Sequence, residues 1–299
     1  MSRMLDSLLA ASAPVVWGST YIVTTQMLPD GYPLTDALLR ALPAGVLLML
    51  VTRKIPSPRW LLRVGILGAL NFTIFWAALF VAAYRLPGGV AATLGAVQPL
   101  LVLLLSRYIL NTPLRMLGVV AAVCGIGGVG LLLLGPNAHI DFIGTGAALV
   151  GAVSMAVGVV LTHKWHPPVS ALTFVAWQLT AGGLLLLPLA LIYEPPLPTL
   201  TLMNALGFVW LGLIGAALSY FFWFRGIERL GPAAVTNFGF LSPLTAVLLG
   251  WVLLGEALTE IQLLGVIIVL VCVWVGTRSN RVTAPDPVPR PALQASVKG

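Results

Sequence analysis

The sequence predicts an all-α integral membrane protein with ten transmembrane helices, arranged as two inverted five-helix repeats. The first observation is composition: 59% of the 299 residues are hydrophobic and 8% are charged, whereas a soluble domain carries about 25% charged residues. The second is the spacing of the apolar stretches, and the third is the placement of the basic residues between them. Composition alone excludes a soluble globular protein and a disordered one.

Ten apolar stretches are separated by clusters of proline, glycine and charged residues. Each is close to the 20 or so residues that a helix needs to cross a bilayer. Ala11-Ser12-Ala13 resembles a signal-peptidase site, but apolar sequence continues to Met27, so we expect an uncleaved first span. The predicted spans are 8–28, 35–52, 60–82, 88–108, 113–134, 142–163, 170–192, 203–226, 231–254 and 259–277.

The basic residues predict the orientation of these spans. If the N-terminus is cytoplasmic, every Lys and Arg except Arg40 and Arg85 falls in a cytoplasmic segment. This favours cytoplasmic N- and C-termini in a multi-pass membrane protein. The polar, proline-rich segment 278–299 is predicted to be a disordered cytoplasmic tail. The net charge of +7 is scattered between apolar runs, so no nucleic-acid partner is expected.

The chain also matches itself. Residues 1–137 form the first predicted repeat, and 138–277 the second. Because five helices are an odd number, the second copy enters the membrane from the opposite side. In carriers of this kind the substrate site lies near the midplane between the repeats. The matches include Gly95 with Gly239 and Pro99-Leu100 with Pro243-Leu244 at an offset of 144, and Gly45 with Gly183 at an offset of 138.

The second half contains Leu241-Ser242-Pro243 and Leu254-Gly255-Glu256-Ala257-Leu258. With the doubled five-helix pattern, these residues resemble the drug/metabolite transporter superfamily, in particular its ten-helix EamA-like carriers. Within these, the chain is most similar to bacterial aromatic amino-acid exporters. The resemblance implies a secondary carrier that exports small neutral (zwitterionic) amino acids, with aromatic ones favoured, by alternating access across the cytoplasmic (inner) membrane of a bacterium. One departure is that Asn111-Thr112 stands where the second half has Gly255-Glu256.

Two prolines predict hinges in the fourth and ninth spans. Pro99 and Pro243 cannot donate to the carbonyls of Gly95 and Gly239, four residues earlier. Carbonyls exposed in this way could accept hydrogen bonds from a substrate ammonium group. The alternative is a packing kink without a role in binding.

Aromatic and polar residues recur at equivalent positions of the two halves. Such density suits a cavity for a planar, partly apolar ligand, and the alternative is core or lipid-facing packing. Trp17, Thr20, Tyr21 and Thr24 share one face of the first span. The predicted substrate-binding residues are Trp17, Tyr21, Asn71, Phe75, Trp76, Thr93, Gln98, Ser154, Tyr220, Trp223, Asn237 and Ser242.

Charge inside the spans is scarce. No Asp or Glu is predicted deep within one, which argues against a proton antiporter of cationic drugs and favours a substrate without net charge. Arg40 lies about one turn inside the second span, and we expect its guanidinium to snorkel outward. An anion site at Arg40 is the alternative.

Other classes of protein are less well supported. Cys124, Cys272 and the three histidines form no metal-ligating or catalytic pattern, so neither a cofactor nor a metal nor enzymatic activity is expected. A channel fits the inverted repeat less well than a carrier does. A carrier of another metabolite or drug, such as a sugar-phosphate, nucleotide-sugar or cationic drug, is the main alternative. Proton coupling and uniport both stay open.

Overall fold

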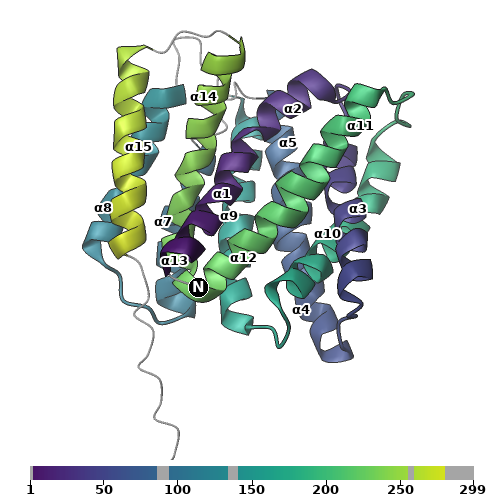
Figure 1. Ribbon diagram of the computed structural model, residues 1–299, viewed down its shortest axis with the longest axis horizontal. Coiled ribbons are helices and arrows are strands. Elements are labelled where there is room, and N and C mark those ends of the chain that lie inside the picture. Colours follow the sequence, from purple (N-terminus) through teal and green to yellow (C-terminus); the bar gives the residue numbers. More distant parts are fainter. Residues whose placement is uncertain (1–2, 86–93, 134–140, 255–258, 280–299) are drawn as a thin grey trace, which may run out of the picture.

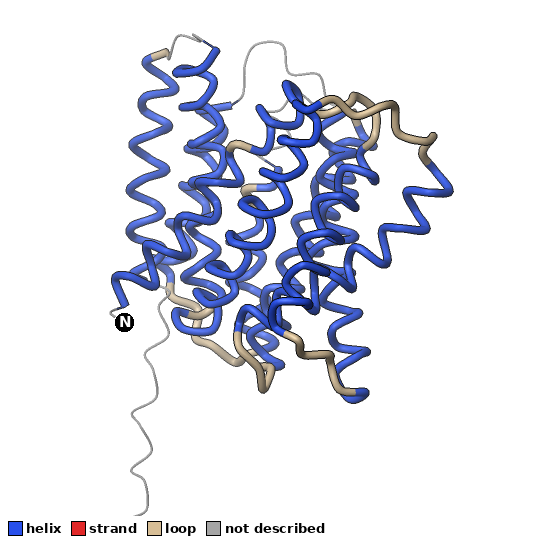
Figure 2. The backbone as a smooth tube through the Cα atoms, turned by 45° about the vertical axis from the view of Figure 1, so that its right-hand side comes forward, coloured by secondary structure: helices blue, strands red, loops and turns tan. Residues whose placement is uncertain are grey.

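A computed structural model describes residues 3–85, 94–133, 141–254 and 259–279. This part of the chain consists of helices and short connections and contains no strand (Figure 2). Seven of its helices are long and apolar enough to cross a membrane, and Gln98–Ile109 and Met116–Leu131 are shorter apolar helices. The all-α class is therefore confirmed, and each of the ten predicted spans coincides with at least one described helix.

The helices pack side by side in one bundle (Figure 1). Their bounds are α1 Arg3–Gly18, α2 Thr20–Met27, α3 Pro33–Thr52, α4 Pro58–Gly68, η1 Ala69–Ile74, α5 Phe75–Arg85, α7 Gln98–Ile109, α8 Met116–Leu133, α9 Phe142–Trp165, α10 Ala171–Tyr193, α11 Leu202–Val209, η2 Trp210–Leu218, α12 Ser219–Leu230, α13 Pro232–Val235, η3 Thr236–Phe240, α14 Leu241–Leu254 and α15 Glu260–Ser279.

The predicted prolines mark interruptions in the helices. α7 begins at Gln98 after a turn at Ala96 and Val97, so Pro99 lies in its first turn. The residues predicted as a hinge therefore coincide with a break before α7, and the missing N–H of Pro99 costs little in the first turn of a new helix. In the ninth span, the 3₁₀-helix η3 separates α13 from α14, and Pro243 lies in the first turn of α14.

Two π-helical segments, η1 and η2, interrupt the third and eighth spans. An offset of 144 residues carries η1 onto 213–218, which lies inside η2. A hydroxyl reaches back five residues at each: Thr73 Oγ1 lies 3.5 Å from the carbonyl of Gly68, and Ser219 Oγ lies 2.6 Å from that of Ile214. Wide turns of this kind rearrange the backbone acceptors and often occur at functional sites.

The long helices α3 and α10 pack against each other through reciprocal glycine contacts. A Cβ added to Gly45 would lie 2.5 Å from the backbone nitrogen of Thr180, and one added to Gly183 would lie 2.7 Å from Cβ of Leu42. The offset of 138 carries Gly45 to Gly183 and Leu42 to Thr180, so each contact is the counterpart of the other. Residue numbers rise along one helix as they fall along the other, so the two helices are antiparallel. Reciprocal contacts of this kind are typical of a two-fold axis.

The same relation extends to the neighbouring helices. A Cβ on Gly68 of α4 would lie 3.0 Å from the carbonyl oxygen of Gln178, and one on Gly212 of η2 would lie 3.7 Å from that of Arg40. Gly68 and Gly212 differ by 144, and Arg40 and Gln178 differ by 138. Four helices of the bundle centre thus pack in a symmetric manner.

Large aromatic side chains fill the centre, and aliphatic ones cover the outside. The most buried side chains include Trp76, Trp223, Tyr220 and Phe72, whereas residues such as Leu62 are largely exposed. α8 and α15 lie side by side at one edge of the bundle (Figure 1). An apolar outer surface over helices is what a lipid environment requires.

Ion pairs at one end of the bundle join α1 to α12. The carboxylate of Asp6, which is almost fully buried, lies 3.0 Å from Arg225 Nη2 and 3.2 Å from Arg229 Nη1. Burial alone would raise the pKa of Asp6, but the hydrogen bonds from Arg229 and Arg225 outweigh it and lower this pKa. Asp6 is therefore ionised near neutral pH and ties the two helices together.

Candidate functional site

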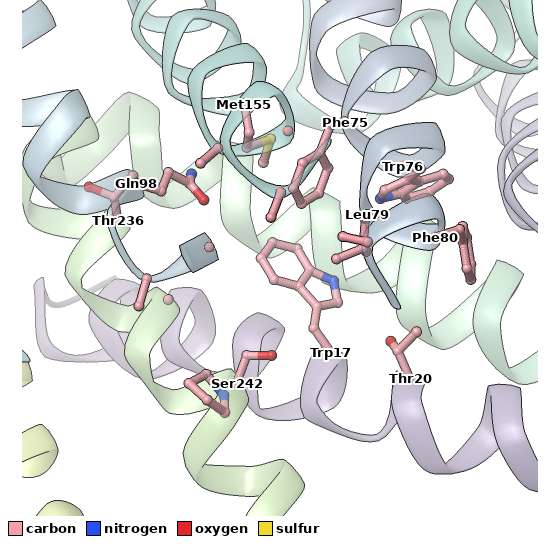
Figure 3. Close-up of a pocket in the computed structure, with 18 of the residues that line it drawn as sticks. Trp17, Thr20, Phe75, Trp76, Leu79, Phe80, Gln98, Met155, Thr236 and Ser242 are labelled. Carbon is pink, nitrogen blue, oxygen red and sulfur yellow. The ribbon is translucent and has the colours of Figure 1, made fainter. Parts of the chain in front are cut away.

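A cavity of about 440 Å³ lies between the two halves of the chain (Figure 3). Its volume is in the usual range for small-molecule sites. It reaches Thr25 near the C-terminal end of α2 and Ala82 near the C-terminal end of α5, whereas Asp6 lies at the N-terminal end of α1. Its described lining residues are Trp17, Thr20, Thr24, Thr25, Arg40, Phe75, Trp76, Leu79, Phe80, Ala82, Gly95, Ala96, Gln98, Pro99, Ala148, Gly151, Ala152, Met155, Tyr220, Trp223, Thr236, Gly239, Phe240, Ser242 and Pro243.

Trp17 stands at the centre of the cavity. Gln98 and Thr236 lie on one side of its indole, and Trp76, Leu79 and Phe80 lie on the other (Figure 3). The indole nitrogen donates a hydrogen bond of 2.9 Å to the carbonyl of Gly215 in η2. The π-helix therefore fixes the orientation of this aromatic side chain.

Aromatic rings from both halves of the chain form a cluster at the wall of the cavity. The ring of Trp17 lies 4.8 Å from that of Tyr220 and 4.9 Å from that of Trp223. Phe72 lies 4.7 Å from Tyr220 and 5.1 Å from Trp76, in tilted and edge-to-face arrangements. Rings from both halves thus interlock in the geometry that aromatic pairs prefer.

Arg40 contributes the charge of the site. Its side chain is 2% exposed, so the expected snorkelling of its guanidinium is wrong. Nη2 donates to the carbonyl of Gly215 at 3.2 Å, and the guanidinium carbon lies 4.5 Å from the ring centre of Trp76. These contacts hold the group at the cavity, where among the described lining residues it is the one charged side chain.

The helix interruptions supply backbone to the cavity wall. Gly95, Pro99, Gly239 and Pro243 all line it. Gly95 and Pro99 stand on either side of the turn that precedes α7, and Gly239 and Pro243 stand on either side of the junction between η3 and α14. In the ninth span, the N–H of Leu241 donates to the carbonyls of Gly239 and Phe238. The predicted hinge residues therefore come together at one cavity, with Gln98 and Ser242 beside them.

The lining also carries the indole N–H of Trp223 and the hydroxyl of Thr24, which have no hydrogen-bond partner among the described residues. Buried polar groups are normally paired, so these two are available to a bound molecule.

Three of the predicted binding residues do not line the described cavity. Asn71 donates to Gln178 Oε1 at 2.8 Å and to Thr162 Oγ1 at 3.3 Å, and Ser154 donates to the carbonyl of Leu70 at 2.8 Å. These bonds link η1 and its neighbours to α9 and α10.

The third residue, Asn237, donates to the carbonyl of Ala233 at 2.6 Å and packs against Gly276 of α15. All three polar residues hold helices together in the positions that the structure gives them. Thr93 and the side chain of Tyr21 lie outside what is described.

Some residues of the site were not among the predicted set. Thr20 and Thr24 share the helical face of Trp17, so their spacing could have identified them. Outside the cavity lining, Asp36 at the start of α3 is completely buried, and neither carboxylate oxygen accepts a hydrogen bond from a described residue. No sequence signal separates it from an acid at the membrane surface. The described residues contain no cluster of His, Cys, Asp and Glu that could hold a metal ion.

Comparisons with known proteins agree with this architecture. The chain is 47% identical over 259 residues to Protein PecM of Dickeya dadantii, covering 86% of this chain and 87% of that protein. It is 30% identical over 287 residues to the uncharacterized inner membrane transporter YedA of Escherichia coli, covering 94% and 93%. A solved crystal structure at 20% identity superposes with a TM-score of 0.81 over 93% of this chain and 98% of that one, which shows a shared fold.

The EamA-like transporter family matches the chain twice, over residues 5–134 and 142–277. Its bacterial relatives include named inner membrane transporters, and neither the family nor these relatives are named as enzymes. The chain therefore belongs to the EamA-like transporter family, within the drug/metabolite transporter superfamily, and is a multi-pass membrane transporter.

Proposed function

We propose that this transporter is a secondary carrier that exports small zwitterionic amino acids, aromatic ones favoured, across the bacterial cytoplasmic membrane. The observation that carries the proposal is the cavity of about 440 Å³ with an aromatic wall and one positive charge. Planar side chains stack well on tilted aromatic rings. Trp17, Trp76 and Tyr220 offer such rings at the point where the two halves meet.

The polar groups of the cavity fit both ends of a zwitterion. Backbone carbonyls at the interruptions near Gly95 and Gly239 are suitable acceptors for an ammonium group. The N–H of Trp223 and the hydroxyl of Thr24 add hydrogen-bonding capacity. A sugar-phosphate or nucleotide-sugar would require several cationic side chains, and Arg40 stands alone in the described lining. A cationic drug would meet the repulsion of that same residue.

The two-fold packing of α3 and α10 supports an inverted repeat of residues 1–137 and 138–277. Reciprocal antiparallel contacts are what a local two-fold axis across the helices would produce, and such an axis would lie in the membrane plane. Two nearly equivalent halves can exchange conformations, and this exchange opens the cavity to one side and then the other. We place both termini in the cytoplasm, from the distribution of basic residues. The Asp6 ion pairs then close the cytoplasmic end.

Counterflow in proteoliposomes tests the substrate class. Purified protein should exchange radiolabelled tryptophan or phenylalanine with saturable kinetics and transport leucine more slowly. Glucose 6-phosphate and tetraphenylphosphonium serve as representatives of the anionic and cationic alternatives. Flux that is saturable for either of these and linear for aromatic amino acids would reject the proposal.

The same vesicles test the driving force. Efflux that accelerates with an inward proton gradient supports proton coupling, and equal rates with and without the gradient support uniport.

Accessibility of single cysteines placed at the ends of α3 and α10 tests the inverted arrangement. Labelling of the N-terminal ends of both helices from the same side would contradict it.

A further inference from the structure

We propose that Arg40 binds a carboxylate of the transported molecule, so that the cavity selects aromatic ligands that carry one carboxylate. This inference deepens the proposed function, because it assigns one end of the substrate to a named side chain. It rests on the burial, the position and the surroundings of Arg40.

The guanidinium of Arg40 lies where the burial of a charge costs free energy. The side chain is 2% exposed, within a candidate membrane-spanning helix. Charged residues in such positions usually face the interior of the bundle or a cavity and mark the path of a substrate. The cavity reaches Arg40, so an anion inside it could pair with the guanidinium, and Arg binds carboxylates through two parallel hydrogen bonds.

A comparison of the two halves shows that the equivalent helix contact is made without a charge in the second half. Gln178 is the counterpart of Arg40 at the offset of 138, and it pairs with Asn71 through a neutral amide–amide hydrogen bond of 2.8 Å. The counterpart of Asn71 at the offset of 144 is Gly215, which has no side chain. Arg40 instead reaches the backbone carbonyl of Gly215 at 3.2 Å. The same helix contact is therefore neutral and closed in one half, and cationic and open to the cavity in the other.

The surroundings hold the guanidinium in a fixed direction. The carbonyl of Gly215 also accepts the indole N–H of Trp17, and the ring of Trp76 lies 4.5 Å from the guanidinium carbon. The charge therefore sits between the aromatic side chains on which a planar substrate would stack. A ligand with a ring and a carboxylate can make both contacts at once.

Four indole ligands separate the contributions of the two charged ends. Indole-3-acetate has a carboxylate without an ammonium, tryptamine has an ammonium without a carboxylate, tryptophan has both and indole has neither. Affinities of the purified, detergent-solubilised protein are measured by calorimetry. The variants are Arg40→Gln and the double variant Arg40→Gln/Gly215→Asn, which rebuilds the neutral amide pair of the other half. Arg63→Gln is the matched control, because Arg63 stacks on Trp60 at 5.2 Å and does not line the cavity.

The wild type should bind indole-3-acetate and tryptophan more tightly than indole. Arg40→Gln should weaken both carboxylate ligands about 10- to 100-fold and leave tryptamine unchanged or bound more tightly. The double variant should fold like the wild type and show the same selective loss, which separates binding from packing. Arg63→Gln should retain wild-type affinities.

The outcomes distinguish this inference from the proposed function. Binding of indole-3-acetate but not of tryptophan would reject the amino-acid class and retain the role of Arg40. Equal weakening of tryptamine and indole-3-acetate by Arg40→Gln, or a wild type that binds neither carboxylate ligand, would overturn the inference.

Discussion

Substitution of the two interface glycines tests the symmetric packing of α3 and α10. A Cβ at Gly45 would lie 2.5 Å from a backbone nitrogen, and one at Gly183 would lie 2.7 Å from the Cβ of Leu42. Ordinary contact begins near 3.4 Å, so either alanine forces the helices apart by close to 1 Å, because backbone cannot rotate away. Overpacking of this size costs about 1–3 kcal/mol. At about 2–4 °C per kcal/mol for a chain of this size, the midpoint of thermal unfolding should fall by about 2–12 °C.

The measurement is thermal unfolding of the purified variants in one detergent. Gly127→Ala is the control, because Gly127 lies in helix α8 with no atom within 4 Å of an added Cβ. It should be neutral or stabilising, since alanine favours a helix over glycine by about 1 kcal/mol. The double variant Gly45→Ala/Gly183→Ala should cost less than the sum of the single ones, because one separation of the helices relieves both clashes. Single variants as stable as Gly127→Ala, or fully additive losses, would refute the symmetric packing.

Three further predictions concern individual side chains. Trp17→Phe keeps an aromatic ring at this position but removes the hydrogen bond to Gly215, so we expect KM for tryptophan counterflow to rise about fivefold, equivalent to about 1 kcal/mol. An unchanged KM would contradict the role of Trp17. Asp36→Asn replaces a buried carboxyl that has no described hydrogen-bond partner, so the free energy of unfolding should change by less than about 1 kcal/mol, whereas any acceleration of efflux by a proton gradient should disappear. A variant that keeps this acceleration would exclude Asp36 from proton coupling. The pKa of Asp6 is lowered in the folded protein, so its ion pairs stabilise the fold fully above the pKa of Asp6 in the unfolded chain, and this stabilisation is lost as the pH falls through the lower folded-state pKa. Asp6→Asn should therefore lower the stability at neutral pH and reduce the loss of stability on acidification. A variant whose unfolding has the pH profile of the wild type would refute this.

The sequence predicted well those features that depend on local chemistry. Apolar length defined the spans, and the pairs Gly95–Pro99 and Gly239–Pro243 marked two places where the helices are interrupted. Equivalent aromatic positions such as Trp76 and Tyr220 also indicated the residues that meet at the cavity.

Features that depend on packing between distant helices were not predictable. The burial of Arg40 follows from the carbonyl of Gly215 and the ring of Trp76, which are remote from it in sequence. Asn71 and Asn237 are as polar as binding residues, but their partners lie in the protein and not in the cavity. Periodicity could not reveal the π-helices either, because their wide turns occupy apolar sequence that would equally suit an α-helix.

The π-helix η2 has a consequence for how the chain tolerates a change in its length. A wide turn of this kind takes up an extra residue inside a helix, so the helical segments on either side of it keep their register. Removing a single residue from 210–218 would let the turn tighten into an ordinary α-helix and would leave Tyr220 and Trp223 facing the same rings. The carbonyl of Gly215 would then return to the i→i+4 pattern of an α-helix and become a poorer acceptor for Trp17 and Arg40. Such a deletion would therefore release these two side chains while the rest of the aromatic wall stayed in place.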